Sequence, residues 1–186
     1  MKEHMMFGGP WRGPLITHGE GVYCYDRDGK AYLDCESQAW SLNLGLNNRE
    51  VIDAAFEQAQ YIHHIKGGLN TFPRLMLVEK ILDLVPDVFD RVSFEPSGSI
   101  ANEAAFKISM INNPDARYFI RMYHAFHGNT LATSAAGWHA TKAPGYYGGG
   151  KKYLGFMDNF VRVPNPYCYR CPYKKKFGEC DYLCAE

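Results

Sequence analysis

The chain has 186 residues with 20 basic and 20 acidic side chains, so its formal net charge at pH 7 is zero. This balance gives no electrostatic reason to bind nucleic acid or an anionic membrane surface, and no apolar run approaches the ~18 residues of a membrane-spanning helix. The apolar fraction of 46% is that of an ordinary globular protein. We therefore expect a cytoplasmic protein that binds neither nucleic acid nor membrane.

The first half of the chain predicts a hairpin followed by two helices. Apolar residues alternate on both sides of the Asp28-Gly29 pair, which favours a hairpin with strands near residues 20–26 and 30–35. Apolar residues then recur near the helical spacing, which predicts helices at Arg49–His63 and Pro73–Leu84.

The second half predicts a parallel α/β sheet. Short apolar runs indicate strands at residues 91–95, 117–122 and 159–163, with a helix over 101–110 between the first two. The order strand, helix, strand implies a right-handed crossover, and ligands of such sheets gather at the carboxyl ends of the strands. Residues 137–155 are rich in Gly, Lys, Tyr and Ala without a clean period, so they predict an irregular loop.

A small-residue turn follows the first of these strands and opens a helix. At such a turn the first backbone N–H groups of the helix have no intrahelical partner, and the helix dipole is positive there. Gly98 would let a ligand approach the backbone, while Ser97 and Ser99 add hydroxyl groups. The turn therefore predicts an anion cradle. The simpler alternative is that Ser97 only caps the helix.

A second polar turn follows the next strand and carries Phe126, His127 and Gly128. If the two strand ends lie together, the first turn would hold a phosphate and the second would offer an aromatic face. Phe126 could equally be a core aromatic residue, and His127 could be a structural histidine.

With Ser97-Gly98-Ser99 followed by Phe126-His127-Gly128, the sequence resembles the class III aminotransferases, which are pyridoxal-phosphate enzymes of fold type I. Residues 19–34 look like the N-terminal hairpin of that family. Residues 43–51 are similar to its Asn-x-Gly-His-x-x-Pro-x-Val segment, although the His and Pro are replaced. The resemblance runs from about Gly19 to the end of the chain.

The resemblance implies an α/β fold that is an incomplete fold type I transferase. On this basis residues 1–48 are the N-terminal hairpin segment of the small domain and residues 49–90 are connecting helices. Residues 91–186 are then the first, truncated part of the large parallel-sheet domain that binds the cofactor. We expect the chain to be the N-terminal piece of a longer enzyme.

The resemblance also implies roles for individual residues. The cofactor-binding residues, for pyridoxal 5'-phosphate, are Ser97, Gly98, Ser99, Phe126, His127 and Gly128. Trp40 lies where relatives place substrate-pocket residues, with simple packing as the alternative. Glu103 resembles a glutamate that relatives carry near the cofactor, but it could equally support the helix dipole. No catalytic residue is expected in this chain, because none of its lysines lies in the context of the family's cofactor-binding lysine.

The activity implied is transfer of an amino group from an amine or amino acid to a 2-oxo acid, by a homodimer. An aminomutase or a decarboxylating relative is an alternative within the family. A third hypothesis is a protein that binds a nucleotide or a sugar phosphate. The sequence lacks the phosphate-loop signature and the acidic metal ligands expected of such a protein. We expect the 186 residues to be inactive and poorly soluble by themselves.

Four cysteines near the end of the chain suggest a different functional hypothesis. Cys168, Cys171, Cys180 and Cys184 form a C-x2-C-x8-C-x3-C pattern that could hold zinc in a tetrahedron. A small zinc-binding module centred on this loop is therefore a second functional hypothesis. Reduced thiols in a surface loop are the simpler interpretation, and we assign no metal ligand from the sequence.

Overall fold

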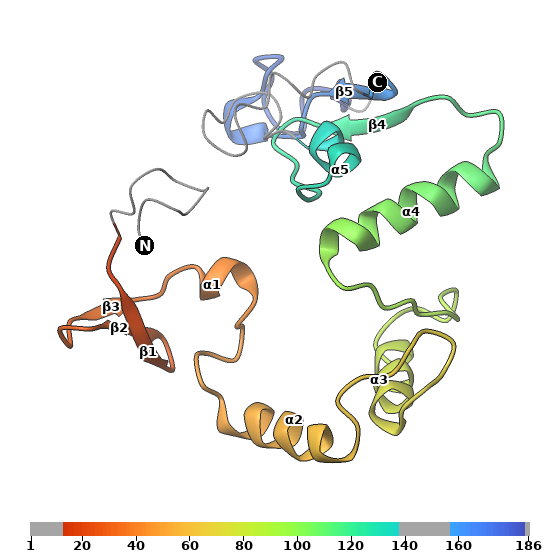
Figure 1. Ribbon diagram of the computed structural model, residues 1–186. Helices are drawn as coiled ribbons and strands as arrows, with labels where there is room; N and C mark the ends of the chain where they lie inside the picture. Colours follow the sequence, from red (N-terminus) through yellow and green to blue (C-terminus); the bar gives the residue numbers. More distant parts are fainter. Residues whose placement is uncertain (1–12, 138–156, 185–186) are drawn as a thin grey trace. The chain divides into compact units, whose positions relative to one another are not determined.

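The computed structural model describes residues 13–137 and 157–184 (Figure 1). Contacts divide the chain into two units that meet in sequence between Val92 and Ser93, and each unit is described by itself. Within the described ranges, no helix is long and apolar enough to cross a membrane. The loop predicted at residues 137–155 lies outside the described residues apart from Gly137.

The first unit begins with a three-stranded antiparallel sheet in the order β1 (Ile16–Glu20), β2 (Tyr23–Asp26), β3 (Ala31–Leu33). The sequence predicts a single strand near residues 20–26, which is confirmed over Tyr23–Asp26 but wrong at its start. Gly21 adopts a φ of +55°, so the chain turns back there and Glu20 pairs with Tyr23. A glycine in the first position of a two-residue loop favours such a hairpin.

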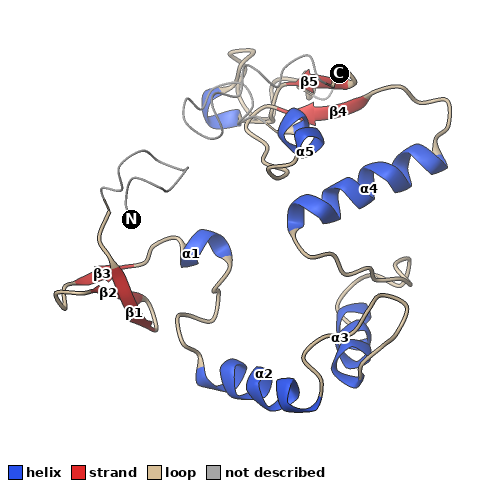
Figure 2. Cartoon of the chain, viewed as in Figure 1, coloured by secondary structure: helices blue, strands red, loops and turns tan. Residues whose placement is uncertain are grey.

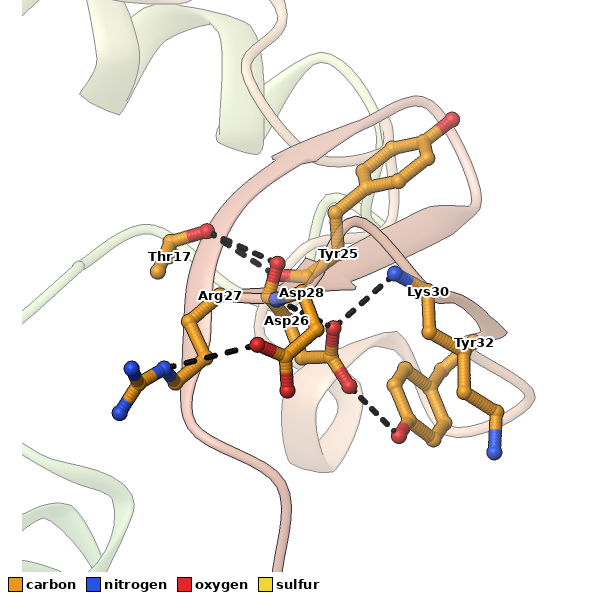
Figure 3. A network of polar contacts seen from close by, with 7 residues as sticks. All are labelled: Thr17, Tyr25, Asp26, Arg27, Asp28, Lys30 and Tyr32. Carbon is orange, nitrogen blue, oxygen red and sulfur yellow. Dashed lines mark hydrogen bonds and ion pairs between the residues drawn. The ribbon is translucent and has the colours of Figure 1, made fainter.

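Asp26 organises the second hairpin, as Figure 3 shows. Its carboxylate accepts hydrogen bonds from the amides of Asp28 and Lys30, each at 2.9 Å, and from the Tyr32 hydroxyl at 2.9 Å. Desolvation by burial acts to raise the pKa of Asp26. The hydrogen bonds from Lys30, Tyr32 and Asp28 outweigh it, so the pKa of Asp26 is lowered. The predicted turn at Asp28-Gly29 is confirmed, with Gly29 at a φ of +80°.

We expect Asp26→Asn to destabilise the hairpin at neutral pH and to lose that effect in acid. A carboxyl group with a lowered pKa stabilises the folded state above its unfolded pKa of about 3.9, and this contribution disappears as pH falls through the folded value. Urea unfolding at pH 7 and pH 3 measures the difference. Asp28→Asn is the control, because the Asp28 side chain is exposed. If the free energies of unfolding of wild type and Asp26→Asn differed by the same amount at both pH values, this account would be contradicted.

A left-handed turn, α1 (Ser37–Trp40), follows the sheet. All four of its residues have φ between +50° and +61°, a conformation that costs L-residues roughly 1–2 kcal/mol each. Asp34 holds the turn, since its carboxylate accepts from the Glu36 amide at 2.9 Å and the Gln38 amide at 3.1 Å. Trp40 ends the turn and is 75% exposed.

The two helices predicted from apolar spacing are confirmed as α2 (Arg49–Tyr61) and α3 (Phe72–Leu82), drawn in blue in Figure 2. Asn48 caps α2, because its side chain accepts from the Val51 amide at 3.2 Å. Neither helix buries any residue. The faces that the spacing predicts to be buried are therefore left open within this unit, with Phe72 76% exposed.

The second unit contains α4 (Gly98–Asn112) and a two-stranded parallel sheet of β4 (Phe119–Met122) and β5 (Phe160–Val163). The parallel pairing and both strands are as predicted, with Phe119 opposite Phe160. The strand predicted at residues 91–95 is wrong: the segment has no strand structure, because no described strand pairs with it.

Three phenylalanines pack α4 onto this sheet. Phe106 of α4 lies with its ring centroid 5.2 Å from that of Phe119 and 5.4 Å from that of Phe160, and the two strand rings stack at 5.3 Å. These separations are those of favourable aromatic pairs. The cluster fixes the helix against the strands and so fixes where the start of α4 stands relative to the end of β4.

The short helix α5 (Leu131–Ala136) contributes most of the buried residues of this unit. Thr130 and Thr133 form a reciprocal capping box at its start. At its end the guanidinium of Arg121, from β4, donates to the Gly137 carbonyl. Arg121 is only 6% exposed, and burial together with the nearby Arg162 charge lowers its pKa.

Candidate functional site

The start of α4 has the geometry of an anion cradle. The Ser97 side chain caps the helix by accepting from the Ile100 amide at 3.3 Å, as predicted. The amides of Gly98 and Ser99 lie in the first turn, where no intrahelical carbonyl is available to them. No acidic side chain lies in that turn to oppose the positive end of the dipole. A Cβ added to Gly98 would meet nothing within 4 Å, so the approach to the backbone is open.

The structure brings the two predicted turns together. The amide of Asn129 donates to the Ser99 hydroxyl at 3.1 Å, which leaves the hydroxyl hydrogen of Ser99 available to an anion. Gly128 is buried against Ser99 with a φ of +132°. A Cβ at Gly128 would lie only 2.8 Å from the Ser99 Cα and even closer to its Oγ. This contact therefore requires glycine both for its size and for its backbone conformation.

Two further hydrogen bonds tie the second turn to α4. The Asn102 side chain donates to the His127 carbonyl at 2.7 Å, and the Thr130 hydroxyl donates to the Glu103 carboxylate at 2.5 Å. Glu103 therefore holds the second turn through the N-cap of α5, a role that neither sequence interpretation included. Together with the Ser99 contact, these bonds join residues about thirty positions apart in the chain.

Phe126 and His127 lie in the second turn, after the end of β4 and next to the contact between Gly128 and Ser99. Phe126 is 54% exposed, so its ring is not enclosed by the described residues of this unit. His127 is half-buried and its backbone carbonyl is used by Asn102. Trp40 belongs to the first unit, so the geometry of the second unit does not test its predicted role as a substrate-pocket residue.

Sequence reasoning missed three residues of this junction, namely Asn102, Asn129 and Thr130. A signal existed for Thr130, because threonine is a favoured N-cap residue at the start of a helix. None existed for Asn102, since an asparagine inside a helix shows nothing in sequence about a partner 25 positions away.

The arrangement as a whole offers a phosphate two backbone amides, a serine hydroxyl and a helix dipole, and the exposed Phe126 lies two residues before Gly128 in the second turn. Comparison with known proteins shows which family this sequence matches. Residues 10–180 match the family described as Aminotransferase class-III. The chain belongs to the class III aminotransferase family. Membership agrees with the resemblance drawn from the two turns, and nothing in the comparisons supports the zinc-module hypothesis.

Curated relatives are about one-third identical to this class III chain over the segments that align. It is 35% identical over 176 residues to the uncharacterized aminotransferase YhxA of Bacillus subtilis, covering 91% of this chain and 37% of that protein. It is 33% identical over 177 residues to the taurine–pyruvate aminotransferase of Bilophila wadsworthia, covering 91% and 36%. The chain thus spans little more than a third of the length of the relatives it matches.

Solved structures of transaminases show the same fold. The taurine:2-oxoglutarate aminotransferase of Bifidobacterium kashiwanohense, in complex with PLP and glutamate, superposes with a TM-score of 0.75 at 27% identity, over 91% of this chain and 36% of that one. The ω-transaminase of Pseudomonas jessenii, in complex with PMP, gives 0.71 at 28% identity, over 86% and 35%. The class III chain therefore has part of the fold type I transaminase fold, as the sequence predicts.

Proposed function

We propose that this class III chain forms the phosphate-binding and ring-binding part of a pyridoxal 5'-phosphate site in an aminotransferase. The junction between the start of α4 and the turn after β4 carries the proposal. It combines open backbone amides, a serine hydroxyl and a helix dipole next to an aromatic residue, and each of these suits a phosphorylated aromatic cofactor. The PLP and PMP complexes of the structural relatives support the choice of ligand.

In this proposal the amides of Gly98 and Ser99 and the Ser99 hydroxyl hold the phosphate, and Ser97 keeps the first turn in shape. Phe126 lies against the cofactor ring, with His127 and Gly128 beside it. When bound, the cofactor supplies an aldehyde and an electron-withdrawing ring. In this proposal the chain binds and orients that ring, so that the cofactor is held in the position from which it can react.

The reaction we propose is transfer of an amino group from an amine or amino acid to a 2-oxo acid. The names of the relatives support a donor whose amino group is at the end of the molecule, since taurine aminotransferases and an ω-transaminase are among them. Trp40 is our candidate for a substrate contact, because a large exposed aromatic held by a strained turn is a costly arrangement for packing alone.

The remaining features of the proposal rest on the resemblance. Residues 1–48 are the hairpin segment of a small domain, residues 49–90 are connecting helices, and residues 91–186 begin the cofactor domain. We propose a cytoplasmic homodimer. The 186 residues alone are proposed to be inactive, because none of their lysines stands in the context of the family's cofactor-binding lysine.

A direct assay tests the proposed activity. An enzyme that carries these 186 residues together with a cofactor-binding lysine is purified, loaded with PLP, and given pyruvate or 2-oxoglutarate and a panel of donors that includes taurine, a primary amine and an α-amino acid. Formation of alanine or glutamate that depends on both donor and PLP is the expected result, at least with the terminal-amino donors. PLP-dependent loss of the donor without formation of alanine or glutamate would contradict the proposal.

A further inference from the structure

The four cysteines near the end of the chain surround one small cavity. Cys168, Cys171, Cys180 and Cys184 all line it, together with apolar side chains that include Phe177 and Leu183. Its volume is about 20 Å³, enough for a single water-sized ion or molecule. All four cysteines have unbridged thiols. The sequence spacing alone did not require that both cysteine pairs face the same space.

Backbone turns present each pair to this cavity. Cys168 lies in a turn closed by the Arg170 amide on the Tyr167 carbonyl at 3.2 Å, which includes the short helix η3 (Cys168–Arg170), and Cys171 follows this turn directly. Cys180 opens a second turn, closed by the Leu183 amide on the Cys180 carbonyl at 3.1 Å, and Cys184 comes next. Such turns place two thiols on one side of the chain with few intervening residues.

The segment has little else to hold it in place. Residues 164–184 contain no strand and no helix besides η3, and none of them is buried. A segment without a core of its own generally needs a disulfide, a metal ion or a partner to become rigid. The backbone nevertheless follows turns that bring both cysteine pairs to a common cavity.

The charge of the segment also suits a thiolate cluster. Between Cys168 and Cys184 the sequence has four basic and two acidic side chains, a formal excess of two positive charges. Four thiolates around a divalent cation carry two negative charges. Lys175 and Lys176 both line the cavity, so they are placed to offset that charge.

We propose that Cys168, Cys171, Cys180 and Cys184 bind one Zn²⁺ ion that rigidifies this loop and takes no part in amino transfer. Zinc favours four thiolates in a tetrahedron at about 2.3 Å. Among the described residues no three potential ligands already stand in metal-binding positions, so the thiols must converge when the ion binds. Rotation about each χ1 moves the sulfur without moving the backbone. Binding releases the thiol protons, so affinity falls at low pH.

Metal titration of the purified, chelator-treated protein under reducing conditions tests the proposal. With zinc alone we expect about one tightly bound ion per chain, and with cobalt alone the absorption of tetrahedral thiolate coordination. Cys171→Ser and Cys180→Ser should both lose the ion. Cys35→Ser is the matched control, because Cys35 is exposed and lies in the other unit, and this variant should keep the ion.

A second measurement does not depend on whether the variants fold. In the unmodified protein, zinc should protect all four cysteines of the loop from alkylation while Cys35 stays reactive, as mapped by mass spectrometry. No bound metal, binding that survives both loop substitutions, or protection by disulfide formation in place of zinc would each overturn the proposal. None of these outcomes depends on amino transfer, so this test is separate from that of the proposed function.

Discussion

Gly128→Ala is expected to separate the two turns that form the proposed cofactor site. The new Cβ would lie 2.8 Å from the Ser99 Cα, and the residue would have to keep a φ of +132°. Backbone cannot yield as the end of a flexible side chain does, so we expect a loss of unfolding free energy of about 1–3 kcal/mol. We also expect loss of PLP binding, because Ser99 and the Asn129 amide would be pushed apart. Urea unfolding and equilibrium dialysis with PLP measure the two effects.

Two other glycines provide controls for this substitution. A Cβ at Gly67 or Gly98 would meet nothing within 4 Å, and neither glycine has the positive φ that strains other residues. Gly67→Ala should leave both stability and PLP affinity unchanged. Gly98→Ala should keep the fold but weaken PLP binding, because the methyl group enters the open approach to the cradle. A Gly128→Ala protein as stable as Gly67→Ala would contradict the described contact.

Ser99→Ala is expected to reduce PLP affinity about 10- to 150-fold. The substitution removes a hydroxyl that both accepts from the Asn129 amide and, in our proposal, donates to the phosphate. A hydrogen bond to a charged group contributes about 1.5–3 kcal/mol, which corresponds to that range. Pyridoxine 5'-phosphate is the better probe, because it has no aldehyde and reports non-covalent binding alone.

Ser97→Ala distinguishes phosphate binding from helix capping. Ser97 accepts from the Ile100 amide, so its loss should cost about 1 kcal/mol of stability. Its effect on affinity for pyridoxine 5'-phosphate should be small. If Ser97→Ala weakened binding as much as Ser99→Ala, the assignment of the phosphate contact to Ser99 would be wrong.

Local patterns predicted most of the elements of this class III chain. The helices α2, α3 and α4 and the strands β4 and β5 follow from apolar spacing and from short apolar runs. The errors occurred where a local pattern was not sufficient. Gly21 was included in a strand although its φ turns the chain, and residues 91–95 were predicted as a strand that has no partner among the described residues. Strand formation requires a neighbour, which no local pattern contains.

The candidate site was predictable in its parts but not in its assembly. Small residues before a helix indicated the cradle, and a polar turn after the next apolar strand indicated the second turn. The contact between Gly128 and Ser99 and the hydrogen bond from Asn102 to His127 join residues 25 or more positions apart. Such contacts depend on how α4 packs against β4, here through the phenylalanine cluster, and therefore appear only once the fold is known.

A crystal structure of the protein with bound PLP tests the central claim most directly. Our account predicts the phosphate within hydrogen-bonding distance of the Gly98 and Ser99 amides and the Ser99 hydroxyl, with the Phe126 ring against the cofactor ring. A phosphate bound elsewhere, with the start of α4 occupied by protein or solvent, would contradict it.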